Sequence, residues 1–163
     1  MKLGLQLGYW GAQPPDNHAE LVAAAEEAGF DTVFTAEAWG SDAYTPLAWW
    51  GRETSRVRLG TQVTGVTYRN PAMLAKIVTT LDVISKGRAM MGIGAAWNDV
   101  EHAGFGYEFP SVKERMDRLD EALTIIDRIS DAYIGKPFPM RSGNVYVVDA
   151  EAQGSVTLPF EDA

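Results

Sequence analysis

The segment from Arg88 to Asn98 is the clearest candidate for ligand-binding chemistry in this sequence. It reads Arg-Ala-Met-Met-Gly-Ile-Gly-Ala-Ala-Trp-Asn, an apolar strand that continues directly into a loop of glycine and alanine. Small side chains at the end of a buried strand let the backbone approach a ligand closely. We therefore expect Gly92 and Gly94 to face a ligand, because a simple turn rarely needs further small residues after it.

Other polar residues follow predicted strands, and each of them has two interpretations. Glu37 is either an active-site acid or a solvated loop residue, and Gln62 either lines a pocket or satisfies backbone groups at a strand end. Arg69 could hold a phosphate, although an exposed loop arginine is commoner. His18 is expected at the surface, while His102, beside Glu101, could approach a substrate, although a surface position in the loop is favoured. The separation of the two histidines gives no metal-ligand spacing, so no metal site is predicted.

Four short strands and four helices alternate along the first 135 residues. The strands are expected at residues 2–7, 32–35, 57–63 and 88–93, and their starts lie 25 to 31 residues apart, which is the period of a βα unit. The expected helices begin at Asn17, near Ala43, at Asn70-Pro71 and at Ser111, where caps or proline mark the first turn. The second helix should bury Leu47, Trp49 and Trp50, and the charges at 113–121 should form a solvated face of the fourth.

A βα repeat of this kind fits two architectures. A dinucleotide-binding fold needs a glycine fingerprint followed at once by a helix, but Trp97 stands where the third glycine should be and the next expected helix begins only near Ser111. A TIM barrel instead needs long loops after the strands, and the loops at 8–16, 36–41, 64–70 and 94–110 suit it. Because a barrel has eight units, we predict a half barrel over residues 1–135 and an irregular extension over 136–163, with one short extended segment at 145–148.

Composition restricts the class of protein. The chain is 46% hydrophobic and 22% charged, carries a net charge of −8 and has a pI near 4.7, so neither nucleic acid nor an anionic membrane surface is an expected partner. It contains no cysteine, which excludes disulfides and thiolate chemistry. No signal peptide or membrane span is evident, and we expect a cytoplasmic protein.

Taken in order, several short motifs of this chain resemble the bacterial luciferase-like superfamily, and within it the oxidoreductases that depend on the deazaflavin coenzyme F420. The resemblance covers roughly residues 2–150, and the family members are TIM barrels that hold F420 or FMN at the carboxyl ends of the strands. The motifs are Leu3-Gly4-Leu5-Gln6-Leu7-Gly8, Ala25-Glu26-Glu27-Ala28-Gly29-Phe30-Asp31, Arg58-Leu59-Gly60-Thr61-Gln62-Val63, Arg69-Asn70-Pro71, Asp82-Val83-Ile84-Ser85-Lys86-Gly87-Arg88, Gly92-Ile93-Gly94-Ala95-Ala96-Trp97-Asn98 and Glu101-His102.

The resemblance implies a role for particular residues. Glu37 matches the acidic residue near the reacting ring, while Ala38 replaces a histidine to which many relatives assign an acid/base step. The Gln62–Val63 bond matches a non-prolyl cis peptide that bulges against the cofactor ring. The loop that contacts the cofactor's side chain and phosphate is matched by Gly94, Ala95, Ala96 and Asn98.

The implied activity is hydride transfer between F420 and a small organic substrate. An FMN-dependent monooxygenase of the same superfamily is the alternative, because the phosphate and ring contacts of the two cofactors look alike. A non-catalytic half barrel that self-associates is a third possibility. Four units leave two sheet edges and an apolar inner face uncovered, so the half barrel must find a partner, close differently or be a fragment. Among these alternatives, we expect a homo-oligomer.

Overall fold

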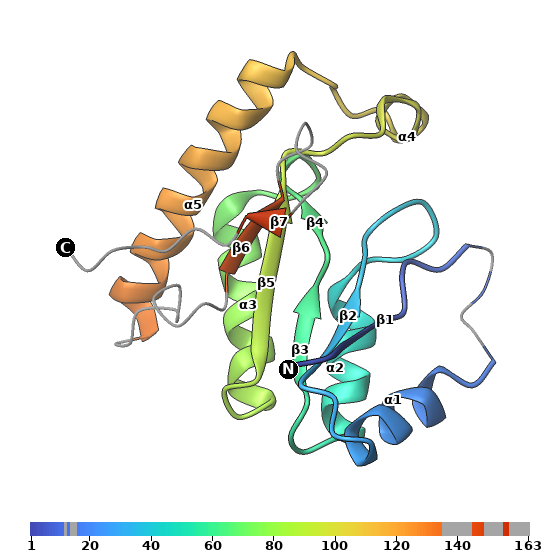
Figure 1. The fold of residues 1–163 in the computed structure, drawn as a ribbon. Helices are drawn as coiled ribbons and strands as arrows, with labels where there is room; N and C mark the ends of the chain where they lie inside the picture. The colour runs from blue at the N-terminus through green and yellow to red at the C-terminus, as the bar shows by residue number, and fades with distance from the viewer. Residues whose placement is uncertain (12, 14–15, 135–144, 149–154, 157–163) are drawn as a thin grey trace.

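The computed structural model describes residues 1–11, 13, 16–134, 145–148 and 155–156, and within them a parallel sheet forms the centre of the molecule (Figure 1). Its order is β1 (Gly4–Gln6), β2 (Thr32–Thr35), β3 (Arg58–Thr61), β5 (Ala89–Gly94) and β6 (Val145–Val148), all parallel. A short β4 (Thr64–Gly65) also pairs with β5, and β7 (Ser155–Val156) runs antiparallel to β6. The parallel sheet with crossover helices confirms the predicted α/β half barrel.

Helices return the chain between these strands. They are α1 (His18–Glu27), α2 (Tyr44–Glu53), α3 (Pro71–Ile84), α4 (Asp99–Phe105) and α5 (Val112–Ile134), with a 3-10 turn η1 (Val66–Tyr68) after β4. Neighbouring helices pack in the order α1, α2, α3, α5 along the sheet. Within the described part of the chain, no helix combines the length and the hydrophobicity that a membrane crossing requires.

The capping and proline signals in the sequence predicted the start of one helix correctly, while other predicted elements differ from the structure. Helix α3 begins at Pro71 as predicted, because the Asn70 side chain accepts the N–H of Ala72 at 2.9 Å. By contrast, the Asn17 side chain forms no capping bond at α1. The expected long loop at 94–110 contains α4, and β6 adds a fifth parallel strand after the point where the βα pattern was expected to stop. Most of residues 136–163 lies outside the described residues, so the predicted division at 135 stays a prediction.

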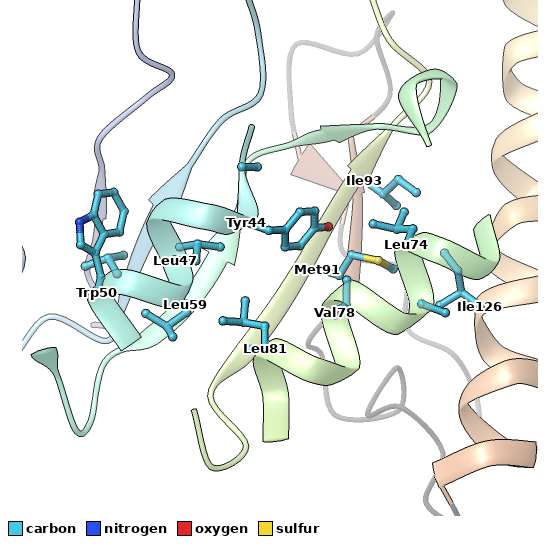
Figure 2. Packing of buried hydrophobic residues seen from close by; sticks show 14 of the residues in the cluster. Tyr44, Leu47, Trp50, Leu59, Leu74, Val78, Leu81, Met91, Ile93 and Ile126 are labelled. Carbon is cyan, nitrogen blue, oxygen red and sulfur yellow. The ribbon is translucent and has the colours of Figure 1, made fainter. Parts of the chain in front are cut away.

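The hydrophobic core lies between the helices and one face of the sheet (Figure 2). Leu47 and Trp50 of α2 are completely buried against it, whereas Trp49 is 52% exposed. The prediction for Trp49 was wrong because adjacent helical residues point about 100° apart, so both tryptophans cannot face the same core. His18 is likewise not at the surface: it is buried, and its Nδ1 accepts the indole N–H of Trp50 at 2.8 Å.

A one-residue bulge separates β3 from β4. Gly60 pairs with Met90 and Thr64 pairs with Ile93, so the β3–β4 side advances four residues while β5 advances three. Within this gap the buried Thr61 hydroxyl replaces the missing ladder bonds: it donates to the carbonyl of Gly92 at 2.7 Å and accepts the N–H of Gly92 at 2.8 Å. The bulge therefore sits near the carboxyl end of the sheet without leaving the backbone of β5 unpaired.

Candidate functional site

The carboxyl edge of the sheet brings together the loops that carry the predicted site residues. Glu37 follows β2, Gln62 and Val63 form the bulge after β3, and residues 94–98 follow β5. Because these strands are parallel and adjacent, their carboxyl ends meet at one edge. Helix α4 lies beyond that edge (Figure 1).

Glu37 is held in a dense set of contacts. Its two carboxylate oxygens form a bidentate ion pair with Arg69, and Oε2 also accepts the Thr64 hydroxyl at 2.6 Å and the Gly65 N–H at 3.3 Å. Burial lowers the pKa of Arg69, but Glu37 more than offsets this effect, so the pKa of Arg69 is raised. The sequence allowed two interpretations of Arg69, a phosphate ligand or an exposed loop residue. Neither describes it, because its guanidinium forms an ion pair with Glu37.

The peptide bond between Gln62 and Val63 is cis, as the resemblance implied. The side-chain amide of Gln6, at the end of β1, donates to the Gln62 carbonyl oxygen and to its side-chain oxygen, both at 3.3 Å. Gln62 itself is exposed. A side chain from β1, two strands away in the sheet, therefore holds the carbonyl of this peptide.

The 94–98 loop presents backbone donors. Ala96 adopts a left-handed conformation with φ 65°, and the N–H groups of Ala96, Trp97 and Asn98 donate to no atom of the residues that the structure describes. Successive free N–H groups around a left-handed residue form the kind of concavity that binds anions. These donors, together with the small side chains of the loop, leave the backbone open to an anionic group.

The side chains of Arg115 and Asn98 hold the 94–98 loop in place. Arg115 of α5 is buried, donates to the Ala95 carbonyl at 3.0 Å and to the Pro110 carbonyl at 2.6 Å, and covers the Phe109 ring at 3.9 Å. It forms no ion pair with a described carboxylate, and its burial shows that the face at 113–121 is not entirely solvated as predicted. The Asn98 side chain accepts the Glu101 N–H at 3.2 Å and so begins α4. This bond occupies the amide that was predicted to contact the cofactor.

Helix α4 follows the loop after β5, and its Glu101 side chain contacts the loop after β2. The buried Glu101 carboxylate accepts the backbone N–H of Trp39 at 2.7 Å. His102 is also buried: its Nδ1 lies 2.7 Å from the Asn98 carbonyl, and its Nε2 lies 2.7 Å from the Thr67 hydroxyl. The expected surface position of His102 was therefore wrong, since both ring nitrogens serve to hold α4 in place.

A cavity of about 460 Å³ opens between α4 and the β2–α2 loop. Its aromatic wall consists of Trp39, Tyr68, Phe105 and Tyr107. Glu37 also lines it, whereas Gln62, Val63 and the 94–98 loop do not. The carboxyl edge thus has two adjoining parts, one lined by backbone donors and one by aromatic rings. In the part of the chain that the structure describes, no group of acidic or histidine side chains is arranged to hold a metal.

Sequence reasoning missed Glu101 and Arg115 as site-positioning residues. For Glu101 a signal was present, because Asn98 followed three residues later by glutamate is the spacing of a capping box and would have located α4. Arg115 gave no such signal. Its carbonyl partner Ala95 is 20 residues away in the sequence, and only the packing of α5 beside β5 brings them together.

Comparison with known proteins identifies relatives of this chain. The sequence model of the luciferase-like monooxygenase family matches residues 3–150. A protein of Mycobacterium tuberculosis that carries the name coenzyme F420-dependent oxidoreductase Rv3520c is 66% identical over 129 residues, covering 79% of this chain and 36% of that protein. The F420-dependent glucose-6-phosphate dehydrogenase of Microbacterium testaceum is 33% identical over 165 residues, covering 90% of this chain and 48% of the relative.

A solved structure agrees with these relatives. Monooxygenase RslO1 from Streptomyces bottropensis matches with a TM-score of 0.66 and 30% identity, over 78% of this chain and 42% of that one. The chain therefore spans less than half the length of each of these relatives. With a family match over almost all of its described residues, this chain belongs to the luciferase-like monooxygenase family, as its motifs predicted.

Proposed function

We propose that the chain binds coenzyme F420 along the carboxyl edge of its sheet and contributes to hydride transfer between F420 and an organic substrate. The observation that carries the proposal is the row of N–H donors at Ala96, Trp97 and Asn98, which no described residue accepts, beside the bulge at Gln62–Val63. Relatives at 66% and 33% identity are named as F420-dependent, which supports this cofactor over FMN.

Each part of the edge has a distinct role in this proposal. The 94–98 loop binds the phosphate-bearing side chain through its backbone donors, with Gly94 and Ala95 leaving room for it. The peptide at Gln62–Val63 supports one face of the cofactor ring, and Gln6 fixes its carbonyl. When bound, F420 supplies the hydride chemistry, as a carrier that accepts or donates a hydride at its ring.

Glu37 is proposed as the acidic residue beside the reacting ring. Because Arg69 and Thr64 occupy its oxygens, Glu37 acts in this proposal by holding a fixed charge pair at the cavity wall. Ala38 carries no exchangeable proton, so it cannot supply the acid/base step that the resemblance assigns to a histidine at that position. Proton transfer then falls to the substrate, to solvent or to another group.

An FMN-dependent monooxygenase activity is the second candidate. The likeness to monooxygenase RslO1 at 30% identity favours it, and the backbone donors of the 94–98 loop suit the phosphate of FMN equally well. Affinity for the two cofactors separates the candidates: tighter binding of F420 supports the first and tighter binding of FMN the second.

A charge substitution in the loop tests the site. Ala96→Asp places a carboxylate among the donors, while Ala96→Asn is its uncharged control of the same shape, and both residues tolerate a left-handed conformation. At an effective dielectric constant of about 40, a carboxylate about 6 Å from a phosphate charge costs about 1.4 kcal/mol, so it weakens binding about tenfold. Fluorescence titration with F420, and with FMN in parallel, should show this difference between the two variants. Equal affinity for F420 in the two variants would contradict the assignment of this loop.

A further inference from the structure

We propose that the cavity between α4 and the β2–α2 loop takes a flat aromatic molecule that carries no negative charge. The inference rests on the proposed function, because it identifies the class of organic substrate that would meet the cofactor at this edge. This substrate class differs from the sugar phosphate that the name of the Microbacterium testaceum relative indicates.

The cavity has an exposed aromatic wall. Trp39 is 47% exposed, Phe105 is 52% exposed and Tyr107 is 44% exposed, and all three rings line the cavity. The ring centroids of Trp39 and Phe105 lie 5.6 Å apart at an angle of 57°. Large apolar rings gathered around one concave site are typical of pockets for apolar or aromatic ligands, which gain affinity by burying them.

The backbone that carries this wall is held by contacts within the chain. Trp39 has a left-handed backbone with φ 37°, and the buried Glu101 carboxylate holds its N–H at 2.7 Å. Phe105 belongs to α4, the same helix as Glu101, so the two rings are joined through one rigid element. A preorganised wall loses little conformational freedom when a ligand stacks against it.

The charged groups of the cavity oppose an anionic ligand. Glu37, Asp42 and Glu101 line it with three carboxylates, and Arg69 is the one cation among the lining residues that the structure describes. Both terminal nitrogens of the Arg69 guanidinium bind Glu37, so the positive charge of this arginine is already paired within the cavity wall. The net charge at the cavity wall is therefore negative.

Asp42 is the carboxylate of the cavity whose charge can be removed by substitution without losing its hydrogen bonds. Its Oδ1 accepts the N–H groups of Tyr44 at 2.7 Å and Thr45 at 2.9 Å at the start of α2. Burial raises the pKa of Asp42, but these donors outweigh it and lower the pKa below its ordinary value, so the side chain is charged at neutral pH. Asparagine accepts the same two bonds, so Asp42→Asn removes the charge and keeps the helix start.

Three probes with one ring system and different charges test the proposal on the full chain. They are 1-naphthalenemethanol, which is neutral, 1-naphthoate, which is anionic, and 1-naphthylmethylammonium, which is cationic. Ligand-observed NMR titrations should show binding of the neutral and cationic probes and about tenfold weaker binding of naphthoate, because each 1.4 kcal/mol of repulsion is a factor of ten. In Asp42→Asn the naphthoate affinity should rise severalfold while that of the alcohol stays unchanged.

A tryptophan pair locates the bound probes. Trp39→Leu should weaken binding of the neutral probe by about tenfold through loss of the stacking surface. Trp49→Leu is the matched control, since Trp49 is equally exposed on α2 but does not line the cavity, and it should bind like the unaltered chain. Naphthoate that binds as tightly as the alcohol, an unchanged affinity in Trp39→Leu, or no binding of any probe would overturn the inference.

Cofactor titration of the same samples separates this inference from the proposed function. F420 binding without the expected probe selectivity overturns the choice of substrate class alone. Selective probe binding without F420 binding supports the cavity assignment and contradicts the proposed cofactor.

Discussion

Glu26 gives the prediction whose magnitude follows most directly from the structure. Its carboxylate, near the end of α1, accepts the backbone N–H groups of Ser55 at 3.0 Å, Arg56 at 2.7 Å and Val57 at 2.8 Å, where the chain enters β3. Partial burial raises the pKa of Glu26, but these donors outweigh it and lower the pKa from 4.5 to about 2. Glu26→Gln keeps one neutral acceptor and loses the charge, so it should destabilise the fold.

The size of the effect follows from that pKa. A lowering by about 2.5 corresponds to about 3.4 kcal/mol, and the solvent exposure of the carboxylate reduces the expected loss to about 2 kcal/mol. Because the folded pKa is depressed, this stabilisation is fully present above the unfolded pKa of about 4.5 and is lost as the pH falls through the folded pKa. The stability difference between the native chain and Glu26→Gln should therefore be constant near pH 7 and shrink from about pH 5 toward pH 2.

Urea unfolding followed by circular dichroism measures this difference at each pH. Glu27→Gln is the matched control, because Glu27 is exposed and its side chain forms no hydrogen bond or ion pair with a described residue. A loss below about 0.5 kcal/mol in Glu26→Gln at pH 7, within the range of ordinary surface substitutions, would show that these contacts do not stabilise the fold. So would a difference that does not depend on pH.

Three other substitutions have expected costs that the same unfolding assay checks. Gly40→Ala places a Cβ 2.0 Å from the carbonyl oxygen of Gly11, so the loops after β1 and β2 must separate, at a cost of about 1–3 kcal/mol. Arg88→Lys cannot replace the fork of donors that binds the end of α2 and the residues before β3, and should cost about 2–4 kcal/mol. Thr61→Val keeps the shape but leaves the buried N–H of Gly92 without its acceptor, at about 1–3 kcal/mol. Stability unchanged within about 0.5 kcal/mol would contradict the account of that contact in each case.

Local signals in the sequence predicted the fold class. The spacing of strand starts and the proline at Pro71 depend on neighbouring residues only, and the structure reproduces both the βα order and the start of α3. The extended segment predicted at 145–148 is confirmed as β6, but its place as a fifth parallel strand was not predicted. Strand β6 follows a segment without a clear βα pattern, and its place in the sheet depends on pairing with β5, more than 50 residues earlier.

The candidate site was only partly predictable for a similar reason. Short motifs located the loops after β2, β3 and β5, because such loops carry their own composition. The burial of side chains at these loops depends on partners that are distant in the sequence. Glu37 binds Arg69, which is 32 residues away, and Arg115 donates to the carbonyl of Ala95. His18 appeared polar and exposed in sequence, yet the indole of Trp50 supplies the hydrogen bond that allows its burial.

Amide chemical-shift mapping with F420 shows whether the cofactor binds at the carboxyl edge of the sheet. A ¹⁵N-labelled chain titrated with F420 should show its largest changes at Ala96, Trp97 and Asn98 and at Val63, with smaller changes along α1, which lies away from the carboxyl edge of the sheet. This result would place the cofactor on the backbone donors and the bulge, as proposed. Saturable shifts confined to other surfaces, or no shifts at F420 concentrations up to millimolar, would contradict the account.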